Sequence, residues 1–196
     1  MIEFSNPSTS INNINFPLLA PLWSSWSHFQ NDTSSIVYGY YDASECYDEN
    51  VNQVVSKLVN DYTVTINESS SFVPDNVHLI TWKRLRPSSS SDQEATFQLV
   101  IASSTQGRFV STYAVFVYEK DGVNWSQESI RDKNVLIGYS NGALNASEQL
   151  KYTNPFSKNS DIDSTSTLNL LNQIDKKPGN TGIESRIKIR FNILNY

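Results

Sequence analysis

Apolar residues recur with a period of two along much of this chain, and that pattern limits it to a mainly antiparallel β fold. The alternation is clearest near the end, where Ile187, Ile189, Phe191 and Ile193 are separated by charged or polar residues. A strand with one apolar and one solvated face belongs to an antiparallel sheet rather than a parallel sheet buried on both sides. Strands are predicted at residues 36–41, 77–84, 96–102, 109–118, 135–139 and 187–193. The turn-like 103–107 between the third and fourth predicts a hairpin.

One stretch has a helical period instead. Its apolar residues fall on one helical face at Val51, Val54, Val55, Leu58, Val59 and Tyr62. Asp48 is a suitable N-cap, and Glu49 in the first turn suits the helix dipole. The pattern therefore predicts one amphipathic helix near residues 48–62. The fold class expected is mainly β (α+β), an antiparallel β-sandwich-like domain with this single helix.

The chain reads as one domain over residues 1–196, without an internal repeat or a linker. Residues 1–20 read as an irregular or edge segment, and residues 140–182 as mostly loop. Aromatic residues make up 12% of the chain. Because hydrophobic residues are relatively few, these large rings are expected to supply much of the buried core. Three tryptophans are expected in the core and Trp26 on the surface; the three are Trp23, Trp82 and Trp125.

Charge and targeting signals narrow the function classes. The net charge of −5 argues against a nucleic-acid partner, which requires a basic face. No apolar stretch approaches the roughly 20 residues that span a bilayer, so no membrane insertion is expected. The N-terminus lacks the features of a signal peptide. Cys46 is the single cysteine of the chain, so no internal disulfide can form. It is expected to be an inert, partly buried residue near the helix start.

A catalytic motif is present in form but lacks its partners. Gly138-Tyr139-Ser140-Asn141-Gly142 has the G-x-S-x-G spacing of a hydrolase nucleophile elbow. That chemistry requires a histidine base after the serine, whereas His28 and His78 both precede it. The expectation is a tight turn after a strand and no enzyme. A serine hydrolase using Ser140 remains the weakest alternative.

No cofactor or metal is expected. Neither histidine has zinc-ligand spacing. Asn159, Asp161, Asp163 and Thr165 alternate as in a calcium loop, but the glycine and the closing glutamate of an EF-hand are missing, which favours a solvated acidic loop.

Four N-glycosylation sequons occur, but a chain this rich in Asn, Ser and Thr contains several by chance. Asn31, Asn67 and Asn145 lie in predicted loops and are the expected glycosylation sites if the chain is secreted. Asn124 is the poorest candidate because a bulky Trp follows it.

Several short segments, in order, resemble the nidogen-type extracellular domain. The first is Phe16-Pro17-Leu18-Leu19-Ala20-Pro21-Leu22-Trp23, and Thr81-Trp82 follows after the helix. The others are Thr96-Phe97-Gln98-Leu99-Val100-Ile101, Tyr118 through Trp125, Ile137-Gly138-Tyr139-Ser140-Asn141-Gly142, and Gly179-Asn180-Thr181-Gly182 leading into Ile187–Phe191. Ser25 departs from an acidic residue usual in the family, and the family's first strand lies upstream of Met1, so a truncated domain is expected.

This resemblance implies a non-enzymatic module for cell–matrix adhesion or protein interaction. It implies an extracellular or cell-surface location as part of a larger protein, and a matrix or cell-surface protein as the partner. The alternative is a carbohydrate-binding β-sandwich, in which Trp26, Tyr40 or Tyr41 would stack on a sugar ring.

Overall fold

The computed structural model describes residues 17–23, 33–63, 72–86, 93–106, 109–124, 136–141 and 186–194. Within these ranges lie seven strands and one helix. Their bounds are β1 Pro17–Trp23, β2 Ser35–Asp42, α1 Glu49–Thr63, β3 Asn76–Leu85, β4 Ala95–Gln106, β5 Phe109–Val123, β6 Leu136–Asn141 and β7 Arg186–Leu194. The predicted helix and all six predicted strands are confirmed. The irregular or edge segment expected over residues 1–20 ends in a strand that was not predicted, because β1 begins at Pro17 and lies at the edge of the small sheet as described.

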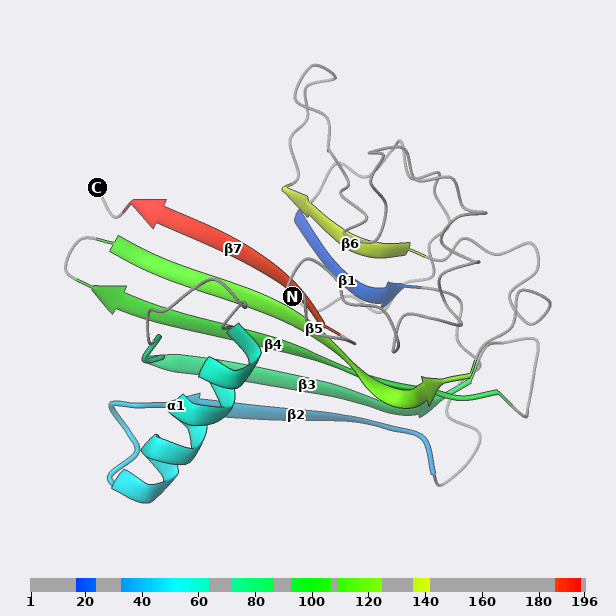
Figure 1. Ribbon diagram of the computed structural model, residues 1–196, viewed down its shortest axis with the longest axis horizontal. Helices are drawn as coiled ribbons and strands as arrows, with labels where there is room; N and C mark the ends of the chain where they lie inside the picture. The colour runs from blue at the N-terminus through cyan, green and yellow to red at the C-terminus, as the bar shows by residue number, and fades with distance from the viewer. Residues whose placement is uncertain are drawn as a thin grey trace, which may run out of the picture.

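Five strands form one antiparallel sheet in the order β2-β3-β4-β5-β7, and β1 pairs with β6 in a second sheet. β4 and β5 form the predicted hairpin, which is paired from Gln106↔Phe109 to Ala95↔Val123. The turn expected at 103–107 is corrected, because β4 continues through Gln106. Figure 1 shows α1 on one face of the five-stranded sheet and the β1–β6 pair on the other. The mainly β class with one helix is confirmed, and the second sheet has two described strands.

Alternation along each strand divides the large sheet between two cores. Trp82, Phe97 and Tyr118 lie on one face, where Leu22 of β1 joins them in a buried cluster. Trp82 and Phe97 stack with ring centroids 5.0 Å apart. The prediction of a core position for Trp82 is confirmed; Trp26, Trp125 and the side chain of Trp23 lie outside what the structure describes.

The opposite face packs on the helix. Val59 of α1 is fully buried in a cluster with Val77, Val100, Ala102 and Val115. Asp48 caps the helix as predicted, because its Oδ1 accepts a hydrogen bond from the Asn50 N–H at 2.9 Å. Cys46 is half-buried just before the helix, as expected.

The apolar face of α1 is wider than the surface it buries, and this corrects the expectation of one buried face. Of the apolar side chains that the structure describes on this helix, only Val59 is fully buried, whereas Val51, Val54 and Leu58 are 42%, 65% and 41% exposed. The helix is therefore rotated so that one side of its apolar arc meets the sheet and the other side lies uncovered by the described residues.

Candidate interaction surface

Two tyrosines are exposed on β2, an edge strand of the large sheet. Tyr38 and Tyr40 are 56% and 51% exposed, and alternation places both on the sheet face that carries Trp82 and Phe116. Further along this face β1 covers the large sheet through Leu22, but Tyr38 and Tyr40 lie beyond that cover among the described residues. Large exposed rings at a sheet edge are suited to recognition, because they offer much contact area with few rotatable bonds.

His78 of β3 completes this surface. It lies directly opposite Tyr40 in the sheet, and the two ring centroids are 4.9 Å apart. His78 also stacks with Tyr38, with ring centroids 6.1 Å apart, and the Tyr38 Oη and His78 Nδ1 share a hydrogen bond of 2.8 Å. These contacts hold the three rings as one unit. We call Tyr38, Tyr40 and His78 the aromatic patch.

Polar groups border the aromatic patch on one side. The Tyr40 Oη lies 3.0 Å from the Asp42 Oδ2 and 2.9 Å from the Asn76 Oδ1, and both oxygens can accept a hydrogen bond from the Tyr40 hydroxyl. The hydrogen bond to Asp42 and the negative charge of that carboxylate raise the pKa of Tyr40. The pKa of Asp42 is lowered, chiefly because the Ser44 Oγ and N–H donate to Oδ1 at 2.6 and 2.8 Å. The surface thus combines two phenol rings with a carboxylate and an amide.

The second tyrosine proposed as a sugar platform has a different role. Tyr41 is half-buried on the helix face, and its hydroxyl donates a hydrogen bond to the Asn52 Oδ1. That interaction joins β2 to α1, so the suggestion of Tyr41 as a stacking platform is wrong on geometric grounds. Tyr40 is exposed as the suggestion required. Tyr38 and His78 were missed, although the i, i+2 spacing of Tyr38 and Tyr40 is a signal that both side chains lie on one face.

The G-x-S-x-G sequence lies in a strand. Ser140 and Gly138 belong to β6, where they pair with Leu18 and Ala20 of β1. A nucleophile elbow requires a sharp turn from a strand into a helix, and Ser140 is within a strand. The tight turn expected at this serine is likewise corrected, because the strand continues through Asn141.

The remaining candidates fall outside the described residues. These are the sequons at Asn31, Asn67 and Asn145 and the acidic stretch 159–165. Asn124 is described and exposed, and its N–H donates to the Glu94 carbonyl at 2.9 Å. In the described part of the chain, no three metal-binding side chains come together. Nor does any helix there have the length and apolar character needed to cross a bilayer.

Comparison with known proteins gives the family. The model of the nidogen-like domain matches residues 1–179, which includes every described strand except β7. Searches of curated proteins and of solved structures each returned no significant match. Because one family model covers most of its length, this chain belongs to the nidogen-like domain family.

Proposed function

We propose that this chain is a non-enzymatic extracellular module that binds a matrix or cell-surface protein in cell–matrix adhesion. Two observations support the proposal: its nidogen-like family, whose domains occur in extracellular proteins, and the aromatic patch with its two exposed tyrosines on the edge strand β2. Exposed tyrosines beside fixed polar groups are typical of protein-binding surfaces, where aromatic residues contribute much of the binding energy.

The single observation that carries the binding role is the exposure of Tyr38 and Tyr40 together. Capture from a matrix extract tests it, with the intact chain and a Tyr38→Ser/Tyr40→Ser variant as parallel baits. The proposal expects a protein that the first bait recovers and the second does not. Equal recovery by both baits would exclude the aromatic patch as the binding surface.

The extracellular location can be tested through the sequons. Expression through a secretory pathway should yield a glycosylated chain modified at Asn31, Asn67 and Asn145, and glycosidase treatment should lower its mass. Replacing these three residues by Gln should abolish the change in mass, whereas Asn124→Gln should leave it intact. A secreted chain whose mass does not change with glycosidase would contradict the use of these sites.

A carbohydrate-binding function is the second candidate, and one observation favours it. Tyr40 presents an exposed ring beside the Asp42 carboxylate and the Asn76 amide. Sugar rings stack on aromatic faces while carboxylates and amides bind their hydroxyls. A glycan array separates the two functions: binding that free sugar competes away favours the lectin, and an array without reproducible binding favours the protein partner.

A further inference from the structure

Among the described residues, nothing gives the outer edge of β2 the protection that edge strands normally carry. No described strand pairs with this edge. Proteins usually guard such edges with lysines, prolines or bulges, because exposed N–H and C=O groups recruit further strands. β2 has the sequence Ser-Ile-Val-Tyr-Gly-Tyr-Tyr-Asp, with no proline or basic residue, and pairs with β3 without a bulge. By contrast β7, at the opposite edge, contains Arg186, Lys188 and Arg190.

The direction of the free backbone groups follows from one hydrogen bond. The Ala43 N–H donates to the Asp75 carbonyl at 2.8 Å, and the register of β2 and β3, extended by one residue beyond Asp42↔Asn76, places these two residues opposite each other. In an antiparallel ladder, alternate residues direct both backbone groups to the same neighbour. Val37, Gly39 and Tyr41 therefore bond to β3. Tyr38 and Tyr40 direct their N–H and C=O groups outward.

Gly39, at the centre of β2, has no steric reason to be glycine within the described fold. A Cβ built there would meet only the Leu79 Cβ at 3.9 Å, which is an ordinary contact, and its φ is not in the left-handed region. Glycine weakens a strand interior, and where it occurs it often marks the close approach of another backbone. Such an approach would come from outside the described fold, at the unguarded edge.

We infer that β2 pairs antiparallel with β2 of a second copy of this chain, around a twofold axis at Gly39. An exposed tyrosine flanks this residue on each side, so the residues nearest the axis are the same in both directions. In this register Tyr38 of each copy lies opposite Tyr40 of the other, and their outward backbone groups exchange hydrogen bonds. Gly39 meets its own copy in a non-hydrogen-bonded pair, where the two backbones approach most closely.

Charge and exposure fit this symmetric partner. Asp42 is the only charged residue of β2, and the register places it opposite Ile36 of the second copy, so the two carboxylates lie at opposite ends of the junction. Because cross-strand aromatic pairs stabilise antiparallel sheets, the meeting of Tyr38 with Tyr40 favours this pairing. The interface is isologous, as twofold dimers require.

The helix face supports the same arrangement. The Tyr41–Asn52 hydrogen bond places the early turns of α1 beside β2, on the face opposite the aromatic patch. On this face three valines are exposed: Val37 of β2 at 54%, and Val51 and Val54 of these turns at 42% and 65%. A twofold axis normal to the sheet puts both helices on the same face, so these valines of the two copies flank the junction. The aromatic patches of both copies join on the other face.

Disulfide trapping tests the pairing even if the dimer is weak. In the full chain with Cys46→Ser, Gly39→Cys introduces a thiol at the axis. Its Cα would lie about 4.5 Å from its copy, within the range of a disulfide. Val37→Cys is the matched control on the same strand face, and its copies would lie roughly 13 Å apart, out of reach. Both positions are exposed.

Under mild oxidation, Gly39→Cys should convert to a covalent dimer at least about ten times faster than Val37→Cys, with both thiols equally reactive toward a small thiol reagent. Equal rates, or no covalent dimer from Gly39→Cys, would overturn the inference. The measurement uses the isolated chain without matrix, so its outcome is independent of whether the aromatic patch binds a matrix protein.

Discussion

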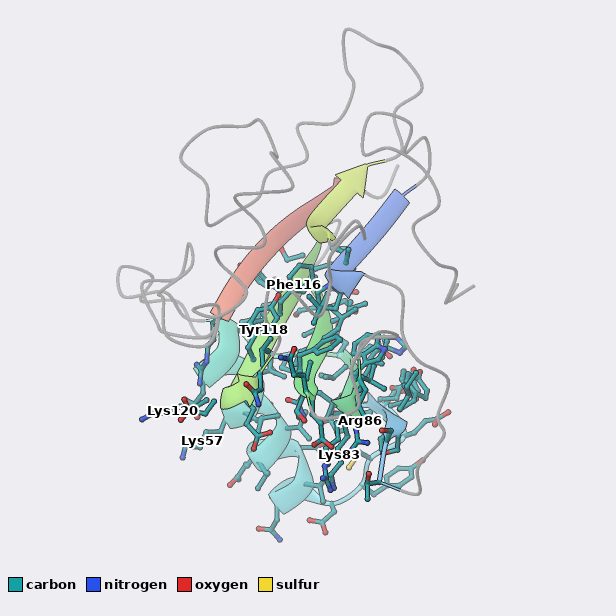
Figure 2. The ribbon with its side chains drawn as sticks, turned by 90° about the vertical axis from the view of Figure 1, so that its right-hand side faces the viewer. Lys57, Lys83, Arg86, Phe116, Tyr118 and Lys120 are labelled. Carbon is teal, nitrogen blue, oxygen red and sulfur yellow. The ribbon has the colours of Figure 1, made fainter. Side chains whose placement is uncertain are left out.

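The Tyr118 hydroxyl donates a hydrogen bond to the backbone carbonyl of Pro21 across 2.6 Å, and this bond joins the large sheet to the small one. Both residues are buried, so water does not compete for either group. The same burial raises the pKa of Tyr118 well above its usual value, and the phenol remains a donor. Figure 2 shows Tyr118 beside Phe116 in the body of the molecule, whereas Lys57 and Lys120 lie at its periphery.

Removing this hydroxyl should loosen the attachment of β1. We expect Tyr118→Phe to lower the free energy of unfolding by about 1–2 kcal/mol, because it leaves the buried Pro21 carbonyl without its donor. Tyr47→Phe, on a side chain that is 94% exposed, is the control and should have no measurable effect. Denaturant unfolding measures both. Equal stability of the two variants would show that the bond contributes nothing.

Two glycines should respond oppositely to alanine. A Cβ at Gly122 would lie 2.9 Å from the Glu119 carbonyl oxygen, so the backbone must shift, and Gly122→Ala should destabilise the fold by about 1–3 kcal/mol. Gly39→Ala meets no such obstacle and should change the stability of the chain by less than about 0.5 kcal/mol. Thermal unfolding at low protein concentration compares them. A large loss from Gly39→Ala would contradict the open space around that residue.

The helix should be sensitive on one side only. Val59→Ala should cost roughly 2 kcal/mol, because its fully buried side chain contacts the sheet. Val54→Ala, at a position 65% exposed, should be neutral or slightly stabilising, since alanine is the better helix former. Urea unfolding of both variants is the test. If Val54→Ala cost as much as Val59→Ala, the observed rotation of α1 would be wrong.

Acid should weaken the bulge at the end of β3. Glu94 forms ion pairs with Arg84 at 2.7 Å and with Arg86 at 2.6 Å. Hydrogen bonds from these two cations, with Arg84 contributing most, lower the pKa of the Glu94 carboxyl. A lowered pKa stabilises the fold above the ordinary value of 4.5, and this contribution disappears as the pH falls through the pKa of the folded state. The contribution is on the order of 1 kcal/mol, because the pair is partly exposed.

Glu94→Gln should therefore lose less stability between about pH 7 and about pH 3.5 than the unsubstituted chain. Arg84→Gln is the matched variant: it keeps a non-glycine residue at the left-handed φ of 53° while removing the first cation, and it should also reduce the pH dependence. An unchanged acid response in both variants would exclude Glu94 as a source of acid sensitivity.

Apart from β1, the elements of this fold were predictable from local periodicity, but their arrangement was not. The alternation in β2 and β3 and the helical spacing after Asp48 are properties of neighbouring residues. The pairing of β1 with β6 joins segments far apart in the sequence, and no local pattern marks it. The orientation of α1 was also hidden, because six apolar residues specify a wide arc but not which side of it contacts the sheet.

The aromatic patch was only partly predictable for the same reason. A run such as Ile36–Tyr41 is typical of a buried strand, and only the position of β2 at the edge leaves Tyr38 and Tyr40 exposed. His78 belongs to the patch through pairing with β2, which the sequence does not specify. The family assignment, by contrast, was available from short ordered segments that individually carry little information.

The most direct test of the proposed function is the equilibrium binding of the intact chain to decellularised matrix, compared with two variants. We predict saturable binding, at least about tenfold weaker for Tyr38→Ser/Tyr40→Ser, because aromatic residues at an interface centre contribute most of its energy. Tyr47→Ser, which removes an exposed tyrosine outside the aromatic patch, should bind as the unsubstituted chain does. Binding that does not saturate, or the same affinity for all three proteins, would contradict an adhesion function for this surface.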